Sequence, residues 1–311
     1  MRHFIAVTLL STAAALASAQ SPQTPAVATA PPTPPDYSKV TITTTKISDS
    51  LYTLDGAGGR VGVLVGKDGI LIVDDEFAPL SDKLIAAIRA ISDGPIRFLV
   101  NTHVHGDHTG GNANFAKQGA VIFARNELRH RLAHPSPSAN GTPGVPAPAE
   151  ALPVVTYEGP VTFHLDGEEV QLLPIQKAHT DGDTVVRFPA SDAILTGDIF
   201  RSTGYPNIDR VNGGSLRGLL DGLGEISALA GPNTKIIPGH GPITDRAAVT
   251  AQRDLVLAVR DRVRVLIKQG KSQQEVLAAH VTAEWDSKLN IPPTASDRFV
   301  GQIYAELSSV N

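Results

Sequence analysis

A short run rich in histidine and aspartate is the part of this sequence most capable of chemistry. It covers residues 103–108 with the sequence HVHGDH and closely follows an apolar segment. The spacing of His103 and His105 lets both imidazoles reach one metal ion, while Asp107 and His108 can face a second ion nearby. Burying these groups without a partner would cost several kcal/mol. The run therefore predicts a metal site; the alternative is a solvated polar turn.

Three isolated residues further along the chain could complete such a site: His179, Asp198 and His240. Each lies just past the end of an apolar segment that predicts a strand, a usual position for binding sites in α/β proteins. Glycines beside Asp198 and His240 let the backbone pass close to an ion. A single histidine is more often structural, but three residues in equivalent positions favour one site shared with residues 103–108.

The composition limits what kind of site this can be. The 311 residues include no cysteine, which excludes disulfides, Fe–S clusters, thiolate nucleophiles and sulfur-bound zinc. Any metal must therefore be held by His, Asp, Glu or water. With 27 Lys and Arg against 31 Asp and Glu, the net charge of −4 argues against nucleic acid or anionic lipid as a partner.

The first residues predict a secretory signal. Residues 1–19 combine a short basic start, an apolar run too short to span a bilayer, and small residues at the end that signal peptidase cleaves after. We therefore expect a periplasmic or secreted protein with no membrane anchor after cleavage. Residues 20–36 are rich in proline and predict a disordered linker.

Alternating strand and helix patterns predict the elements that position the ligands, in a domain over residues 37–250. In its first half we expect strands at 40–47, 50–54, 60–65, 70–73, 96–100 and 120–124, and helices near 81–92, 109–117 and 125–133. In its second half we expect strands at 161–165, 169–174, 184–188, 193–197 and 234–238, and a helix near 215–229. Residues 251–311 predict a helical extension packed on the same domain, with Ser272 and Glu275 as a capping box.

Two loops stand out between these elements. The glycine-rich stretch 56–62 has no helix after it, so it predicts a flexible hairpin tip rather than a phosphate loop. Residues 134–153 are rich in proline and predict a long surface loop, the kind that is often functional. Whether this loop covers the site is open.

Taken in order along the chain, the ligand segments resemble the metallo-β-lactamase superfamily. Its signature is H-x-H-x-D-H, followed by His, then by Asp or Cys, then by His, and matching residues occur over residues 40–250. The resemblance implies an α/β fold, the αββα sandwich, in which two mixed β-sheets pack face to face and helices flank them.

The resemblance also implies a ligand set for two zinc ions, with iron or manganese as alternatives. One ion would be held by three histidines, namely His103, His105 and His179. The other would be held by Asp107, His108 and His240, and Asp198 would bridge the two ions through its carboxylate.

The chemistry that the resemblance implies is hydrolysis at a carbonyl group. A hydroxide between the ions would attack an ester, thioester, lactone or strained amide, because divalent metals lower the pKa of bound water. Asp107 would help to orient or move the proton. Asp74, at the end of the 70–73 strand, would orient a histidine ligand from behind; the alternative is an ordinary strand-end aspartate.

The sequence around Asp198 bears on the substrate. It looks most like β-lactamases of the subclass with a cysteine ligand, in which a lysine three positions after the cysteine binds the substrate carboxylate. Arg201 occupies that place here, and Asn207 matches an asparagine that polarises the lactam carbonyl. Aspartate in place of the cysteine is instead the pattern of glyoxalase II-like thioesterases, lactonases and other hydrolases. We expect β-lactam hydrolysis first, with a lactonase, esterase or thioesterase as the alternative.

A non-enzyme alternative is a binding protein that keeps zinc for structure. Structural zinc sites are closed by four protein ligands. Seven ligands shared by two ions leave positions open for water, which favours a metal-dependent hydrolase with a small-molecule substrate. The oligomeric state is open.

Overall fold

The strands of the chain form two sheets, and the computed structural model describes residues 35–137 and 141–309. The expected signal, residues 1–19, and nearly all of the expected linker, residues 20–36, lie outside the described residues. Residues 36–311 belong to one compact unit, which includes the helices expected in the extension.

The first sheet has seven strands in sequential order, β1 to β7. Pairing is antiparallel from β1 to β4 and parallel from β4 to β7, so the sheet is mixed. The strands are β1 (Thr43–Lys46), β2 (Leu51–Asp55), β3 (Val61–Gly66), β4 (Gly69–Val73), β5 (Ile96–Val100), β6 (Val121–Arg125) and β7 (Val155–Tyr157).

The second sheet has five strands in the order β12-β11-β10-β9-β8. Only the pair β11 and β12 is parallel among its described strands, so this sheet is also mixed. The strands are β8 (Val161–Leu165), β9 (Glu168–Pro174), β10 (Thr184–Phe188), β11 (Ala193–Leu195) and β12 (Lys235–Ile237).

Strands buried on both faces explain why the sheets are sandwiched between helices. In β4, Leu71 and Val73 belong to the cluster between the two sheets, whereas Ile70 and Ile72 belong to a cluster on the outer face. Successive strand residues point to opposite faces, so a strand that is apolar at every position needs cover on both sides. The expectation of an αββα sandwich with two mixed sheets is confirmed.

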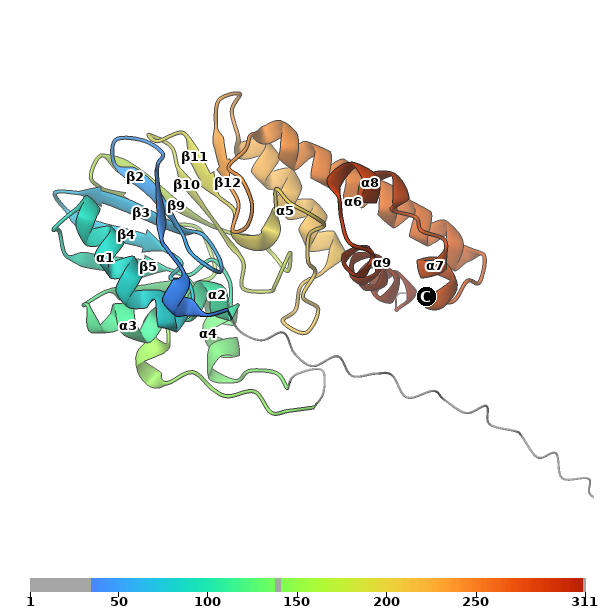
Figure 1. Cartoon of the computed structure of the whole chain (residues 1–311), viewed down its shortest axis with the longest axis horizontal. Coiled ribbons are helices and arrows are strands. Elements are labelled where there is room, and N and C mark those ends of the chain that lie inside the picture. Colours follow the sequence, from blue (N-terminus) through green and yellow to red (C-terminus); the bar gives the residue numbers. More distant parts are fainter. Residues whose placement is uncertain (1–34, 138–140, 310–311) are drawn as a thin grey trace, which may run out of the picture. The chain divides into compact units, whose positions relative to one another are not determined.

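Helices cover the two outer faces (Figure 1). On the first sheet α1 (Ser81–Ile91) and α3 (Asn112–Lys117) contribute to the outer cluster, with the short α2 (Gly106–Thr109) and α4 (Asn126–Ala133) nearby in sequence. On the second sheet the leucine stripe of α5 (Leu216–Leu229) is buried as expected, and α6 (Arg246–Lys268) packs beside it. The chain then continues through α7 (Gln273–Ala278), α8 (Ala283–Leu289) and α9 (Pro293–Ser308).

Most expected elements occur within a few residues of their predicted bounds, and the differences have local causes. The helix expected near 109–117 is two short helices, α2 and α3, separated at Gly110 and Gly111. Strand β7 was not predicted, because only three residues pair there after the proline-rich loop. The capping box of Ser272 and Glu275 is confirmed at the start of α7. Among the described residues, no helix combines the length and apolar character needed to cross a membrane.

Candidate metal centre

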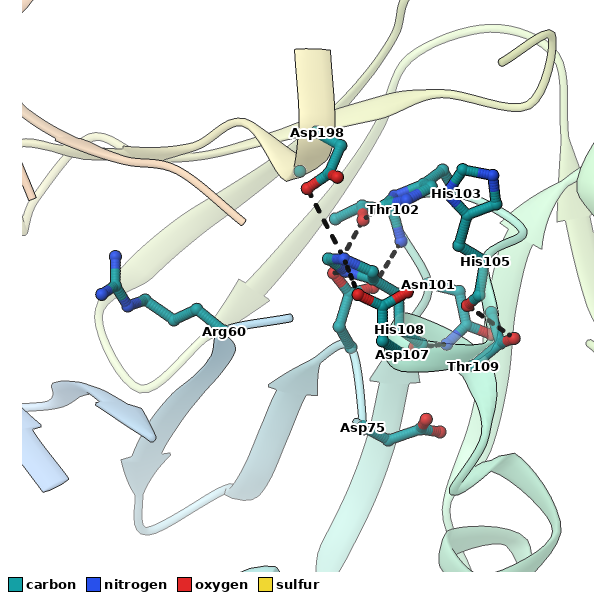
Figure 2. Close-up of polar contacts among 12 residues, drawn as sticks. Arg60, Asp75, Asn101, Thr102, His103, His105, Asp107, His108, Thr109 and Asp198 are labelled. Atoms are coloured by element: carbon teal, nitrogen blue, oxygen red, sulfur yellow. Dashed lines mark hydrogen bonds and ion pairs between the residues drawn. The ribbon is translucent and has the colours of Figure 1, made fainter. Parts of the chain in front are cut away.

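The segments that follow several strands bring the predicted ligands to one place, and Figure 2 shows five of them: His103, His105, Asp107, His108 and Asp198. From the first sheet, His103 and His105 lie in the loop after β5, and α2 carries Asp107 and His108. The second sheet supplies the remaining ligands from loops that follow strands, namely His179 after β9, Asp198 after β11 and His240 after β12. Loops at strand ends let the backbone curl around an ion, which a regular strand cannot do.

The first group of possible ligands consists of three histidines. One nitrogen from each of His103, His105 and His179 lies within 4.8 Å of the others. Nδ1 of His105 and Nε2 of His179 are 3.1 Å apart. Three imidazole nitrogens that converge in this way form a suitable set for one divalent ion.

The second group contains Asp107, His108 and His240, again with ligand atoms within 4.8 Å of one another. Oδ2 of Asp107 lies 3.1 Å from Nε2 of His240 and 3.7 Å from Nε2 of His108. A carboxylate with two imidazoles offers a second ion a donor set that carries negative charge.

Asp198 lies at the junction of the two groups. Its Oδ1 is 3.5 Å from Nε2 of His108, and its Oδ2 is 3.4 Å from Nε2 of His240. It also forms a third cluster with His103 and His108, whose ligand atoms lie within 4.8 Å. A carboxylate placed in this way can contribute to both ions.

Two buried atoms at the centre support a cation there. Nε2 of His103 and Oδ1 of Asp198 are buried, and neither has a hydrogen-bond partner within the described part of the chain. Leaving a buried polar atom unpaired costs about 1–3 kcal/mol, and more when the group is charged. Nitrogen and oxygen donors without sulfur suit zinc, iron or manganese. The residues present therefore fit a pair of divalent metal ions.

Four of the five histidine ligands are held in place by a hydrogen bond at the ring nitrogen that does not face the proposed ion. Nδ1 of His108 is 2.7 Å from Oδ2 of Asp74, and Nε2 of His105 is 2.7 Å from Oδ2 of Asp209. The remaining two contacts are those of His179 Nδ1 with the Asn207 carbonyl at 2.8 Å and of His103 Nδ1 with Thr102 Oγ1 at 3.0 Å. Contacts of this kind set the tautomer and the ring orientation of metal-binding histidines.

The electrostatics of the two groups differ. Burial lowers the pKa of His103 well below its ordinary value, and neighbouring imidazoles lower it further. Burial likewise lowers the pKa of His179 to about 4. Burial also acts against a charged His108, but the negative charge of Asp74 and of other carboxylates outweighs it and raises the pKa to about 9. In the absence of metal, burial therefore disfavours a proton on His103 and His179, whereas the carboxylates beside His108 favour one there.

Both carboxylate ligands remain ionised. Burial acts to raise the pKa of Asp107, but its hydrogen bond with His240 and the charge of His108 hold the pKa well below the usual range. Burial also acts to raise the pKa of Asp198, but the positive charges of His108 and other nearby groups outweigh it and lower the pKa. The ionised carboxylate is the form that binds a metal.

The glycine-rich segment between β2 and β3 packs against the second group. A Cβ at Gly59 would overlap the ring of His108, and the amide of Gly58 donates to the carboxylate of Glu76 at 2.9 Å. Glu76 itself has a positive φ of 61°, a strained backbone for a residue with a side chain. The expected hairpin tip is present, but it is held in place where a flexible tip was expected.

Asp74 lies where its expected role requires. Besides contacting His108, it accepts hydrogen bonds from the amide and hydroxyl of Thr102, each at 2.7 Å. Its φ is 62°, in the left-handed region, which turns the carboxylate from the end of β4 toward the ligands. Sequence reasoning missed Asp209, Glu76 and Gly59, because contacts between distant segments leave no spacing signal in the sequence.

The two residues expected to bind substrate lie in different surroundings. Arg201 points toward the centre, with Nη1 4.0 Å from Oδ2 of Asp198. The side-chain oxygen of Asn207 instead accepts a hydrogen bond from Nε2 of Gln302 at 2.8 Å. The backbone carbonyl of Asn207 lies 2.8 Å from Nδ1 of His179. The roles of both residues toward a substrate stay predictions.

Comparison with known proteins places this geometry in a family. A sequence profile described as "Metallo-beta-lactamase superfamily" matches residues 56–259. A linear primary-alkylsulfatase of Pseudomonas sp. is 25% identical over 272 residues, covering 74% of this chain and 50% of that protein. A hydroxyacylglutathione hydrolase of Polaromonas sp. is 27% identical over 182 residues, covering 57% of this chain and 60% of that protein. The chain thus spans only about half to three-fifths of these relatives.

Solved structures agree on the fold. A metallo-β-lactamase from Pontibacter korlensis superposes with a TM-score of 0.58 at 19% identity, covering 70% of this chain and 99% of that one. The sec-alkylsulfatase Pisa1 from Pseudomonas sp. superposes with a TM-score of 0.65 at 16% identity, covering 85% of this chain and 50% of that one. The resemblance seen in the sequence is confirmed: the chain belongs to the metallo-β-lactamase superfamily.

Proposed function

We propose that this protein is a secreted hydrolase that uses two zinc ions and that a β-lactam is its leading substrate. The observation that carries the proposal is the arrangement of seven oxygen and nitrogen ligands in two groups, with Asp198 at their junction. His103, His105 and His179 would hold one ion, and Asp107, His108 and His240 the other, with Asp198 shared. A set of this size leaves positions open for water and substrate, unlike a structural site with four protein ligands.

Zinc supplies Lewis acidity there when it is bound, since it polarises a carbonyl and lowers the pKa of a coordinated water. The chain's own groups have separate tasks. The carboxylate of Asp107 is ionised and belongs to the second group, so it can orient a water by accepting a hydrogen bond from it. Asp74 and Asp209 hold the rings of His108 and His105 at fixed angles.

Arg201 supports a substrate that carries an anionic group close to the scissile bond. Its guanidinium approaches Asp198, and its Nε is buried without a hydrogen-bond partner among the described residues. Arg201→Ala should raise KM for carboxylate-bearing substrates about tenfold, since hydrogen bonds to charged groups contribute about 1.5–3 kcal/mol. A neutral ester serves as the internal control, and an unchanged KM for the carboxylate substrate would remove this role.

The central test is a hydrolysis panel run with and without a chelator. It contains a penicillin, a carbapenem, a homoserine lactone, a glutathione thioester and an alkyl sulfate. We expect turnover of the β-lactams, loss of that turnover with the chelator, and recovery when zinc is restored. Protein that binds two zinc ions per chain yet hydrolyses no member of the panel would contradict the hydrolase proposal.

A second candidate is hydrolysis of a sulfate ester. The match to the alkylsulfatase of known structure covers 85% of this chain, against 70% for the metallo-β-lactamase, so it extends further along the chain. A sulfate ester also places an anion at the reacting centre, in keeping with Arg201. Turnover of the alkyl sulfate alone would favour this candidate over the β-lactam.

Secretion is supported by the sequence of residues 1–19 and has its own test. Expression of the full chain in a Gram-negative host, followed by fractionation and mass measurement, should recover a periplasmic protein that begins at Gln20. Recovery of the uncleaved chain in the cytoplasm would count against it.

A further inference from the structure

A cavity of about 390 Å³ lies beside the metal centre, where the loop after Asp198 meets helices α6 and α8. We call it the Arg201 cavity. Its wall is mainly apolar, built from Phe200, Ala248, Ala251, Leu255, Trp285 and Leu289. This volume falls within the range of small-molecule sites, which are mostly apolar with a few polar groups that fix orientation.

One of its polar side chains reaches the metal centre. Arg201 lines the cavity and also reaches to 4.0 Å from the carboxylate of Asp198. Gln252, on α6, holds the backbone of Arg201 by accepting from its amide at 3.4 Å and donating to its carbonyl at 2.6 Å. Arg201 therefore links the cavity wall to a metal ligand.

The loop that forms this wall is joined to the second ligand group as well. The hydroxyl of Ser202 donates to the carbonyl of Pro242 at 2.7 Å, two residues beyond His240. The wall is thus tied to the segments that carry Asp198 and His240.

We propose that the Arg201 cavity binds the aliphatic part of an anionic substrate, whose charged group pairs with Arg201 while its scissile bond lies at the metal centre. This deepens the proposed function and rests on it, because it names the substrate class as an anion with an apolar chain. Each methylene group that is buried against the apolar wall contributes to the binding free energy. Arg201 pairs with the negative charge at the end of the substrate that faces the metal ligands.

The chain offers a direct reporter for binding, because Trp285 is its single tryptophan. Butane-, hexane-, octane- and decanesulfonate are titrated into the zinc-loaded protein while tryptophan emission is followed. These probes are anions with an apolar chain, and their C–S bond is not an ester, so binding is measured without turnover. We expect a saturable change in emission, with Kd falling about fourfold for each added methylene until the cavity is full.

Two substitutions on α6 form a matched pair. Ala251→Leu places extra volume in the cavity and should weaken octanesulfonate binding at least tenfold. Ala247→Leu adds the same atoms at an exposed position of the same helix that does not line the cavity, and should leave Kd unchanged. Metal content and melting temperature of both variants show that folding is intact. Octanol, which has no charge for Arg201, should bind about tenfold more weakly than octanesulfonate.

The outcomes separate this inference from the proposed function. A Kd that does not depend on chain length, or that is the same in Ala251→Leu as in the parent, overturns the assignment of the cavity even when the hydrolysis panel succeeds. Binding that depends on chain length and is lost in Ala251→Leu supports the cavity. Failure of the panel alongside such binding counts against the hydrolase and not against the cavity.

Discussion

The metal centre and the Arg201 cavity adjoin each other, yet their side chains are fixed to very different degrees. Four of the histidine ligands each have the second ring nitrogen in a hydrogen bond, to Asp74, Asp209, Thr102 or the Asn207 carbonyl. The backbone of Arg201 is held by Gln252, but its Nε is buried without a hydrogen-bond partner in the described residues.

The difference indicates that the two regions have separate tasks: one binds the metal and the other selects the substrate. Metal binding gains from ligands that are already oriented, because less is lost in ordering them when the ion arrives. A substrate cavity gains from a polar group that is left unpaired until the ligand comes. Helices α7, α8 and α9 lie beyond residues 56–259, the part matched by the superfamily profile. Substrate selection can therefore change in these helices while the metal centre stays the same.

Removing the metal should have the largest effect, and that effect should be confined to the metal centre. A chelator is expected to abolish hydrolysis and to lower the melting temperature, because Nε2 of His103 and Oδ1 of Asp198 are then left buried with no hydrogen-bond partner in the described part of the chain. The stability lost is about 4 kcal/mol if free zinc had exceeded Kd a thousandfold. Turnover and thermal unfolding are measured before and after zinc is restored. An unchanged melting temperature would show that the ligands need no ion to hold them.

Gly59→Ala should have the next largest effect, because a Cβ at this position overlaps the ring of His108. The ring lies between Asp74 and the other two ligands of the second group, Asp107 and His240, so it cannot move away without breaking its 2.7 Å contact with Asp74. We expect zinc affinity of the second group to fall at least a hundredfold, measured by competition with a chelating dye.

Gly106→Ala is the matched control for this change. Gly106 lies within the HVHGDH run itself, but a Cβ there meets nothing within 4 Å. It should bind zinc as the parent does. Equal zinc affinity in the two variants would show that the close approach of Gly59 does not position the second group.

The sequence predicted the ligands far better than the contacts that hold them. The HVHGDH run and the three later ligands carry their signal in residue type, spacing and position after apolar strands. Asp209 carries none, because its contact with His105 joins residues 104 positions apart. Gly59 was recognised as part of a hairpin tip, but the sequence cannot show that His108 packs against it. Likewise, the helical tail was predicted from periodicity, whereas the cavity it forms with Phe200 and Arg201 depends on tertiary packing.

Asp74→Asn should have a smaller effect than the glycine substitution, because the shape of the site is retained. Asparagine keeps the volume but removes the charge that faces Nδ1 of His108. Loss of such an outer contact typically lowers metal affinity ten- to a hundredfold. We expect a loss in this range from zinc titration, and activity that recovers when zinc is raised.

Asp75→Asn tests whether burial alone explains that loss. Asp75 is the next residue and is fully buried. Its carboxyl accepts from the amide of Gly111, and its backbone amide donates to the carbonyl of His108, a contact that the substitution retains. Burial raises its pKa well above the usual range, and an amide of the same shape keeps the acceptor for Gly111. Zinc affinity should stay within twofold of the parent (about 0.4 kcal/mol). A loss equal to that of Asp74→Asn would show that any change beneath the site acts alike.

The smallest effect is expected in the helices beyond the superfamily profile. Ser272 caps α7, and its hydroxyl and backbone amide both pair with Glu275. Ser272→Ala should lower the free energy of unfolding by about 1 kcal/mol, as for other caps, because one amide at the helix start loses its acceptor. Zinc affinity should not change, since within residues 35–137 and 141–309 no hydrogen bond or ion pair joins this helix to a metal ligand. Urea unfolding and zinc titration of the same variant measure the two quantities. A fall in zinc affinity would mean that the helices beyond the superfamily profile also support the metal ligands, and the division of labour between the two regions would no longer hold.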